Sequence, residues 1–318
     1  MKYKISFIVP AYNAEKYIER CLKSLINQDV PVQIVVVNDA STDSTKQICE
    51  SYAKTHNNIK LINLKQNGGV SNARNLAIGV AEGEFVYFVD ADDYVLENSC
   101  KNLISNCDMV IFGKVYDHNG EISKAKFPYV GKITKNKLIK NQLKLFLNVH
   151  TSCWITNKLY KNKIIKKHKI KFEKNVEFSE DLLFNLQYFK YCKKIIFKEQ
   201  YVTFYNRNVP NSLSRKYEKK NISEVIKNRE NLFEYLNKFK IKNFKDYYID
   251  TKNIIIYATK KVLKTSMPKN EKIKELNQIN KIPEIVEYLD KQKPLELLLY
   301  NYIKNKDLKI LECDNEKL

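Results

Sequence analysis

The sequence contains, at residues 85–93, an apolar run that leads directly into three carboxylates: Phe85-Val86-Tyr87-Phe88-Val89-Asp90-Ala91-Asp92-Asp93. Five consecutive aromatic and β-branched residues predict a fully buried strand. The acids then emerge at its C-terminal end, where open α/β sheets build their ligand sites. Asp90 and Asp92 share a face if the strand continues, and carboxylate oxygens suit hard divalent cations. We therefore expect a metal-bound nucleotide here; the alternative is a solvated acidic turn.

The residues before this segment alternate between short apolar runs and helical patterns. Strands are predicted at residues 5–9, 33–37, 59–64 and 85–89, and helices at 14–27, 42–56 and 71–81. Such alternation predicts a Rossmann-like α/β fold: a mostly parallel central sheet with helices on both faces.

The regular alternation of strand and helix patterns ends after residue 94. The patterns there predict helices at 96–106, 135–148 and 181–191, strands at 109–112, 195–197 and 201–205, and a polar hairpin around 117–120. From about residue 217 only helices are expected, at 225–239, 247–263, 273–278, 285–289 and 295–303. We therefore divide the chain into residues 1–215, which hold the sheet, and a basic helical C-terminal region at residues 216–318.

The charge of the chain is concentrated in its second part. The 318 residues carry a net charge of +20. Residues 1–110 hold 11 basic and 13 acidic side chains, whereas residues 111–318 hold 45 and 23. A basic surface attracts nucleic acid, anionic lipid headgroups or phosphorylated substrates, and it can also be no more than a soluble lysine-rich face.

The cysteines and the apolar content indicate the cellular compartment in which the protein is expected. Seven cysteines, an odd number without C-x-x-C spacing, argue against a disulfide framework and a structural zinc site. No run approaches the ~18 apolar residues of a membrane span, and the N-terminus lacks a signal-peptide pattern. We expect reduced thiols and a cytoplasmic protein. His150 and His168 are metal ligands only in principle, since a lone histidine is usually structural.

Two other strands deliver candidate residues to the same edge of the sheet. Ser41, Thr42 and Asp43 are explained by capping of the next helix, but Asp39 has no such role. Its carboxylate can accept an N–H group from a nucleobase. The first strand ends in Pro10-Ala11-Tyr12-Asn13, where the Tyr12 ring either stacks on a base or packs in the core.

Four segments together resemble the family-2 inverting glycosyltransferases with a GT-A fold, of the type that builds bacterial surface glycans. The similarity is close over residues 3–95 and continues loosely to about residue 215. The segments are Val9-Pro10-Ala11-Tyr12-Asn13, Val37-Asn38-Asp39-Ala40-Ser41-Thr42-Asp43, Asn67-Gly68-Gly69-Val70-Ser71-Asn72-Ala73-Arg74-Asn75 and Asp90-Ala91-Asp92-Asp93.

The resemblance implies a role for each matching donor-side residue. Those expected to hold the nucleobase of a sugar nucleotide, most often uridine, are Pro10, Ala11, Tyr12 and Asp39. Arg74 would face the nucleotide, Asp90 the ribose, and Asp92 the Mn²⁺ or Mg²⁺ that bridges the diphosphate. The chemistry needs such an ion because negative charge grows on the leaving phosphate.

An inverting transfer also needs a general base for the acceptor hydroxyl. By the same resemblance Asp181 is that base and Glu180 a neighbour that contacts the acceptor. Without the family, Ser179 followed by two acids is a capped helix start. Arg207 resembles a basic residue near the diphosphate but could equally be a surface residue, and Trp154 either floors the acceptor sugar or packs in the core.

These observations predict a divalent-metal-dependent inverting glycosyltransferase. Its donor is expected to be a nucleotide diphosphate-sugar, most often a UDP-sugar. Its acceptor is a hydroxyl of a surface polysaccharide, a lipooligosaccharide or a lipid-linked glycan. The basic tail suggests peripheral contact with the anionic inner face of the cell membrane. Other classes are a retaining or hydrolytic enzyme, a silent carbohydrate-binding protein and a nucleic-acid-binding protein, although no nucleic-acid partner is expected because no reading motif is present.

Overall fold

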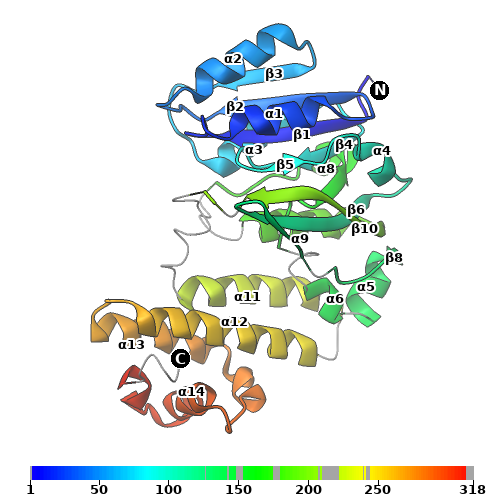
Figure 1. Ribbon diagram of the computed structural model, residues 1–318. Coiled ribbons are helices and arrows are strands. Elements are labelled where there is room, and N and C mark those ends of the chain that lie inside the picture. The colour runs from blue at the N-terminus through cyan, green and yellow to red at the C-terminus, as the bar shows by residue number, and fades with distance from the viewer. Residues whose placement is uncertain are drawn as a thin grey trace. The chain divides into compact units, whose positions relative to one another are not determined.

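The computed structural model describes residues 2–125, 127–141, 143–147, 153–174, 180–206, 208–209, 222–238, 240 and 244–312 (Figure 1). The chain forms two compact units, and each is described separately. The first comprises Met1–Asn141 with Asn148–Val209, and the second Gln142–Leu147 with Pro210–Leu318. Arg207 and Ser179, like His150, lie outside the described residues.

One mixed sheet forms the centre of the first unit (Figure 1). In the described part its strands are β1 (Ile5–Ala11), β2 (Val32–Asn38), β3 (Ile59–Asn63), β4 (Phe85–Phe88), β5 (Tyr94–Val95), β6 (Met109–His118), β7 (Glu121–Lys124), β8 (Gly131–Thr134), β9 (Lys158–Lys161) and β10 (Lys194–Asn206). The strand order is β3-β2-β1-β4-β9-β6-β10-β5, with β7 beside β6 and β8 beside β10.

The sheet is parallel only in its first part. Strands β3, β2, β1 and β4 run parallel, as expected, whereas β9 is antiparallel to both of its neighbours. The remaining pairs are antiparallel except for β6 with β10. A tight hairpin explains the β6–β7 pair, because a two-residue turn joins only antiparallel strands.

Helices cover both faces of the parallel part. The described helices of the first unit are α1 (Ile18–Ile26), α2 (Thr45–Thr55), α3 (Val70–Gly79), α4 (Cys100–Leu103), α5 (Lys135–Asn141), α8 (Asn162–His168) and α9 (Glu180–Tyr191). Phe7 and Val36 share a core cluster with Leu22 of α1 and Cys49 of α2. Helix α3 packs on β1 and β2, and the alternation of strand side chains assigns it to the opposite face.

Several elements differ from those that the sequence predicts. The strands expected at 195–197 and 201–205 are one strand, β10, because bulges between Lys198 and Thr203 absorb the polar interruption. The helix expected at 96–106 is only the four residues of α4, since Asn98 adopts a positive φ of 54° just before it. Strands β5, β8 and β9 and helix α8 were not predicted.

The second unit is helical. Its described elements are α6 (Leu143–Leu147), α11 (Ile222–Asn237), α12 (Lys245–Lys264), α13 (Lys269–Asn277), α14 (Pro294–Asn305) and the 3₁₀ helices η2 (Gln278–Lys281), η3 (Pro283–Tyr288) and η4 (Leu308–Glu312). Ile226, Ile255 and Leu299 are fully buried in its separate apolar core. None of the described helices has the length and apolarity that a membrane span requires.

Candidate functional site

The candidate residues of three parallel strands meet at one edge of the sheet. The register pairs Ala11, the last residue of β1, with Asn38, the last residue of β2. Strand β4 runs parallel to β1 and ends at Phe88. Tyr12, Asp39 and Asp90 therefore follow neighbouring strands at the C-terminal edge, where α/β folds bind their ligands.

The acids after β4 lie in a turn. The condition under which Asp90 and Asp92 would share a face is not met, because the strand ends at Phe88 and the Asp93 N–H donates to the Asp90 carbonyl at 3.0 Å. The Asp93 carboxylate is buried, accepts the Asn206 N–H at 3.0 Å and lies 3.9 Å from the Lys114 ammonium. Asp93 thus anchors the turn, and Asp90 and Asp92 are only partly buried.

Arg74 joins this turn to the start of α9. Its side chain is only 5% exposed, and one guanidinium nitrogen lies 2.9 Å from the Asp90 carboxylate. The other lies 3.0 Å from Asp181 and 3.2 Å from Glu180. One guanidinium therefore links the donor-side acid to the acid pair expected to act on the acceptor.

Contacts of Asn75 and Phe172 hold the start of α9 beside α3. The Asn75 amide exchanges two 2.8 Å hydrogen bonds with the backbone of Phe172. The Phe172 ring stacks on Phe184 of α9 at 4.3 Å and lies 5.2 Å from the Arg74 guanidinium. The Ala73-Arg74-Asn75 sequence thus supplies both the charge and the amide that hold the segment before α9.

The acids have altered proton affinities. Burial raises the pKa of Asp181 to about 7, where Arg74 opposes the shift and Glu180 adds to it. Burial, followed by the neighbouring Asp90 charge, raises the pKa of Asp92 to about 6. Burial alone would lower the pKa of Arg74, but Asp181, Asp90 and Glu180 together raise it. Asp181 is therefore near the proton affinity that a general base needs at neutral pH.

Asp39 is buried and bonded to the glycine turn. Its two carboxylate oxygens accept the N–H groups of Gly68 at 2.7 Å and Gly69 at 2.9 Å. Gly69 has a φ of 80°, which favours glycine. The carboxylate retains lone pairs for a nucleobase N–H. Beside it Tyr12 is 51% exposed, which excludes a core role and leaves its face available for stacking, whereas Ala11 is buried and Pro10 partly so.

Asp92 fits a divalent cation. Among the described residues no other side chain donates a hydrogen bond to its carboxylate, and burial, followed by the negative charge of Asp90, raises its pKa. Hard carboxylate oxygens suit Mn²⁺ or Mg²⁺. In the described part, no group of three or more His, Cys, Asp or Glu side chains has an arrangement that could by itself hold a metal ion. A metal would therefore take most of its ligands from a phosphate and from water.

Lys114 and Arg20 lie near the acids and were not predicted as site residues. Lys114 is 4% exposed and its ammonium donates to Thr156 at 2.8 Å, and both Lys114 and Arg20 lower the proton affinity of Asp92. The sequence feature that could have identified Lys114 is its position as a lysine within the apolar run of β6. Of the other predicted residues, Trp154 is partly buried, and its ring centre lies 5.2 Å from the Lys114 ammonium. The His168 ring stacks on the Tyr191 ring, with 3.6 Å between the ring centres.

The fold, together with the residues at the C-terminal edge of the sheet, indicates the class of protein. An α/β sheet that brings Asp39, Asp90, Asp92 and the Glu180-Asp181 pair to one end has the architecture of GT-A transferases. Residues 6–169 match the sequence model of Glycosyl transferase family 2. The chain belongs to this family.

Comparison with individual proteins agrees with this assignment. The chain is 30% identical over 217 residues to an uncharacterized glycosyltransferase, EpsJ, of Bacillus subtilis, covering 66% of this chain and 62% of that protein. It is 34% identical over 200 residues to the poly(ribitol-phosphate) β-N-acetylglucosaminyltransferase TarS of Staphylococcus aureus, covering 60% and 33%. The chain thus spans less than two thirds of either relative.

Solved structures share the fold. TarS residues 1–349 in complex with UDP superpose with a TM-score of 0.67 at 22% identity, covering 97% of this chain and 89% of that one. A mannosyltransferase of Pyrobaculum calidifontis, in complex with GDP-Man and Mn²⁺, gives 0.55 at 16% identity, covering 96% and 89%.

Proposed function

We propose that this protein is a divalent-metal-dependent inverting glycosyltransferase. It transfers a sugar from a UDP-sugar to a hydroxyl of a bacterial surface polymer of the polyol-phosphate type. The observation that carries the proposal is the contact of one buried guanidinium with Asp90 on one side and with Glu180 and Asp181 on the other. Relatives of known name supply the substrate class: TarS is named for poly(ribitol-phosphate), and its structure was solved with UDP.

The donor side is built from the three strand ends. Tyr12 stacks on the base, Asp39 accepts its N–H, and Asp90 binds the ribose. Asp92 holds the cation, which supplies positive charge against the leaving diphosphate. Asp93, buried and bonded to Asn206, keeps the turn rigid so that Asp92 stays in place.

The acceptor side is the start of α9. Ionised Asp181 accepts the proton of the attacking hydroxyl, and Glu180 binds a second group of the acceptor. Because Arg74 touches both acids and Asp90, it orients the base relative to the donor. Arg74 thereby acts as a positioning residue, and its contact with the nucleotide is indirect.

The reaction itself tests the proposal. The full chain is incubated with UDP-N-acetylglucosamine, Mn²⁺ and poly(ribitol phosphate), and the anomeric signals of the product are followed by proton NMR. An inverting enzyme converts the α-linked donor into a β-linked product. An α-linked product would contradict the role of Asp181, and release of free sugar with acceptor present would indicate a hydrolase.

The pH profile gives an independent prediction about Arg74. We expect kcat/KM to rise with pH through about 7, because Asp181 must be ionised to accept a proton. Arg74→Gln removes the positive charge that lowers the pKa of Asp181, so the rise should move to higher pH. The measurement is kcat/KM between pH 5 and pH 9, with Lys60→Gln on the exposed side of β3 as the charge control. An unchanged profile in Arg74→Gln would contradict the coupling.

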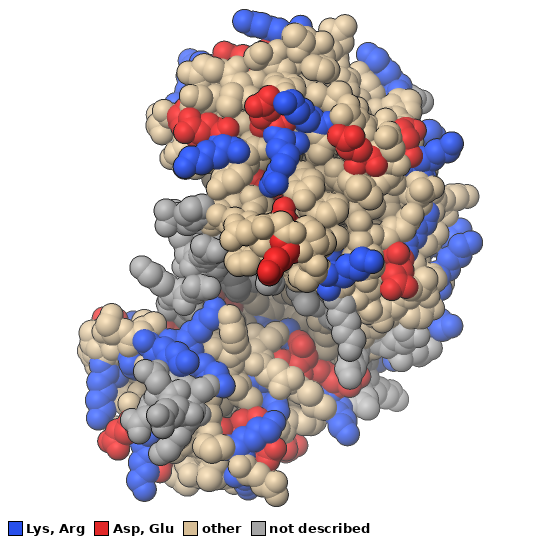
Figure 2. Space-filling view, in the orientation of Figure 1, with Lys and Arg blue, Asp and Glu red and all other residues tan. Residues whose placement is uncertain are grey.

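We also propose peripheral contact of the basic second part of the chain with anionic membranes. On the face drawn in Figure 2, the second unit carries many Lys and Arg side chains interspersed with acidic ones. Anionic lipid adds roughly 1 kcal/mol per nearby basic residue. We expect the protein to float with anionic liposomes at low salt and to be released by high salt. Failure to bind anionic liposomes at low salt would exclude this contact.

A further inference from the structure

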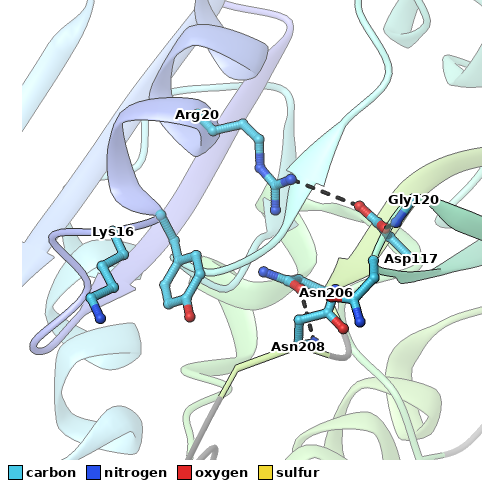
Figure 3. A pocket seen from close by; sticks show the side chains of 8 residues that line it. Lys16, Arg20, Asp117, Gly120, Asn206 and Asn208 are labelled. Atoms are coloured by element: carbon cyan, nitrogen blue, oxygen red, sulfur yellow. Dashed lines mark hydrogen bonds and ion pairs between the residues drawn. The ribbon is translucent and has the colours of Figure 1, made fainter.

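A polar pocket lies beside the acidic turn in the first unit. It has a volume of about 350 Å³ and is formed by the start of α1, the β6–β7 hairpin and the end of β10 (Figure 3). The side chains labelled around it include Lys16, Arg20, Asp117, Asn206 and Asn208. Apart from the Asn206 backbone N–H, which anchors Asp93, and the effect of Arg20 on the pKa of Asp92, these groups have no role in the function proposed above.

Asp117, the carboxylate among the described residues that line the pocket, already has hydrogen-bond partners. Asp117 accepts the Gly120 N–H at 3.0 Å with one oxygen and the Tyr94 hydroxyl at 3.1 Å with the other. The Arg20 guanidinium lies 3.7 Å from that second oxygen and stacks on the Tyr94 ring at 4.2 Å. The Asn119-Gly120 turn, with positive φ at both residues, holds Asp117 in the hairpin. Asp117 therefore fixes Arg20 and does not offer a metal site.

The groups that remain available are donors. The Lys16 ammonium has no ion pair with any described residue. Only one guanidinium nitrogen of Arg20 is paired with Asp117, so its other N–H groups remain available. The Asn206 side chain is nearly buried, and its Oδ1 accepts the Asn208 N–H at 3.0 Å. Its Nδ2 group is left without a partner in the described part of the chain. Figure 3 shows Arg20 and Asn206 close to one another, with Lys16 at the edge of the pocket.

The net charge selects the ligand. Among the described residues that line the pocket, Lys16 and Arg20 against Asp117 leave one positive charge, which matches the single negative charge of a phosphodiester. Charged donors bind phosphate oxygens strongly. The donor diphosphate is expected on Asp92, where a cation offsets its larger charge. In the described lining of this pocket no carboxylate is free to hold such an ion. The pocket therefore suits a phosphate that is bound without metal.

We infer that the pocket formed by Lys16, Arg20, Asn206 and Asn208 binds a phosphodiester of the acceptor polymer. The inference rests on the proposed function, because the acceptor hydroxyl must reach Asp181. In a repeating polymer, the phosphates of neighbouring units lie at fixed chain distances from the reacting hydroxyl. A phosphate subsite therefore selects phosphate-bearing chains over neutral glycans and sets which unit is modified.

Charge removal tests the subsite. We compare Lys16→Gln and the Lys16→Gln/Arg20→Gln double variant with a Lys23→Gln/Lys46→Gln control, whose lysines are exposed and pair with acids four residues away. Binding of a ribitol phosphate oligomer and, separately, of UDP with Mn²⁺ is measured by calorimetry. We expect the double variant to lose about tenfold or more in oligomer affinity and to bind UDP within about twofold of the parent.

The single variant and the two ligands keep the outcomes distinct. Lys16 makes no ion pair with a described residue, so Lys16→Gln should fold normally and weaken oligomer binding about tenfold, and Lys16→Arg should retain the affinity of the parent. Equal oligomer affinity in all variants would overturn the inference. So would weakened UDP binding with unchanged oligomer binding, which would assign the pocket to the donor diphosphate. Failure of the parent to consume UDP-N-acetylglucosamine with Mn²⁺ would instead count against the proposed function.

Discussion

Replacing Asp181 with Asn is expected to lower kcat by roughly 10²- to 10⁴-fold, which is the usual contribution of a general base. The amide has the same shape, and its oxygen can still accept the 3.0 Å hydrogen bond that Asp181 receives from Arg74. It cannot accept the proton of the acceptor hydroxyl. Single-turnover transfer to poly(ribitol phosphate) with saturating donor measures the effect on the chemical step.

Donor binding separates this role from a structural one. Asp39, Asp90 and Asp92 belong to the other end of the site, so UDP affinity with Mn²⁺ should stay within about threefold in Asp181→Asn. Glu180→Gln, a change at the adjacent carboxylate, should raise the acceptor KM more than it lowers kcat. Transfer by Asp181→Asn at more than a tenth of the parent rate would exclude Asp181 as the base.

Replacing Asp92 with Asn is the second change expected to have a very large effect. A bound cation contributes several kcal/mol of charge stabilisation, and each 1.36 kcal/mol is a factor of ten, so kcat should fall by roughly 10²- to 10³-fold. The same variant should lose the Mn²⁺ dependence of UDP binding. Initial rates across a Mn²⁺ titration report both effects.

The control lies at the opposite end of the same strand. Glu82 is exposed and precedes β4, whereas Asp92 follows it. Glu82→Gln removes the same charge at the N-terminal edge, and we expect parent-like kcat and Mn²⁺ dependence. If Asp92→Asn kept its Mn²⁺ response, the cation would be held by another group.

Local patterns were sufficient for the part of the fold that positions the donor. The apolar run at 85–89 predicts a buried strand, and the structure places β4 there with the acids at its C-terminal end. The strands and helices before it follow the same local periodicity. The capping expected from Ser41 and Thr42 is wrong, because Ser44 precedes α2 and makes no capping hydrogen bond. These strands and helices alternate so regularly that the sheet edge carrying Tyr12, Asp39 and Asp90 could be predicted from sequence.

Contacts between distant residues could not be predicted in this way. Arg74 is 107 residues from Asp181, and no periodicity indicates that its guanidinium bonds to α9. The bulged strand β10 appeared as two strands because residues between Lys198 and Thr203 interrupt the apolar pattern. Lys114 was overlooked because its partners, Thr156 and Asp93, come from other segments.

The most direct test of the account is a calorimetric titration of the full chain with UDP in the presence and absence of Mn²⁺. A site in which Asp92 shares a cation with the diphosphate requires the two ligands to bind together. We predict that Mn²⁺ raises the affinity for UDP about tenfold or more, by reciprocal coupling of the two ligands. UDP affinity that is indifferent to divalent ions would contradict the assignment of this sheet edge as a metal-dependent sugar-nucleotide site.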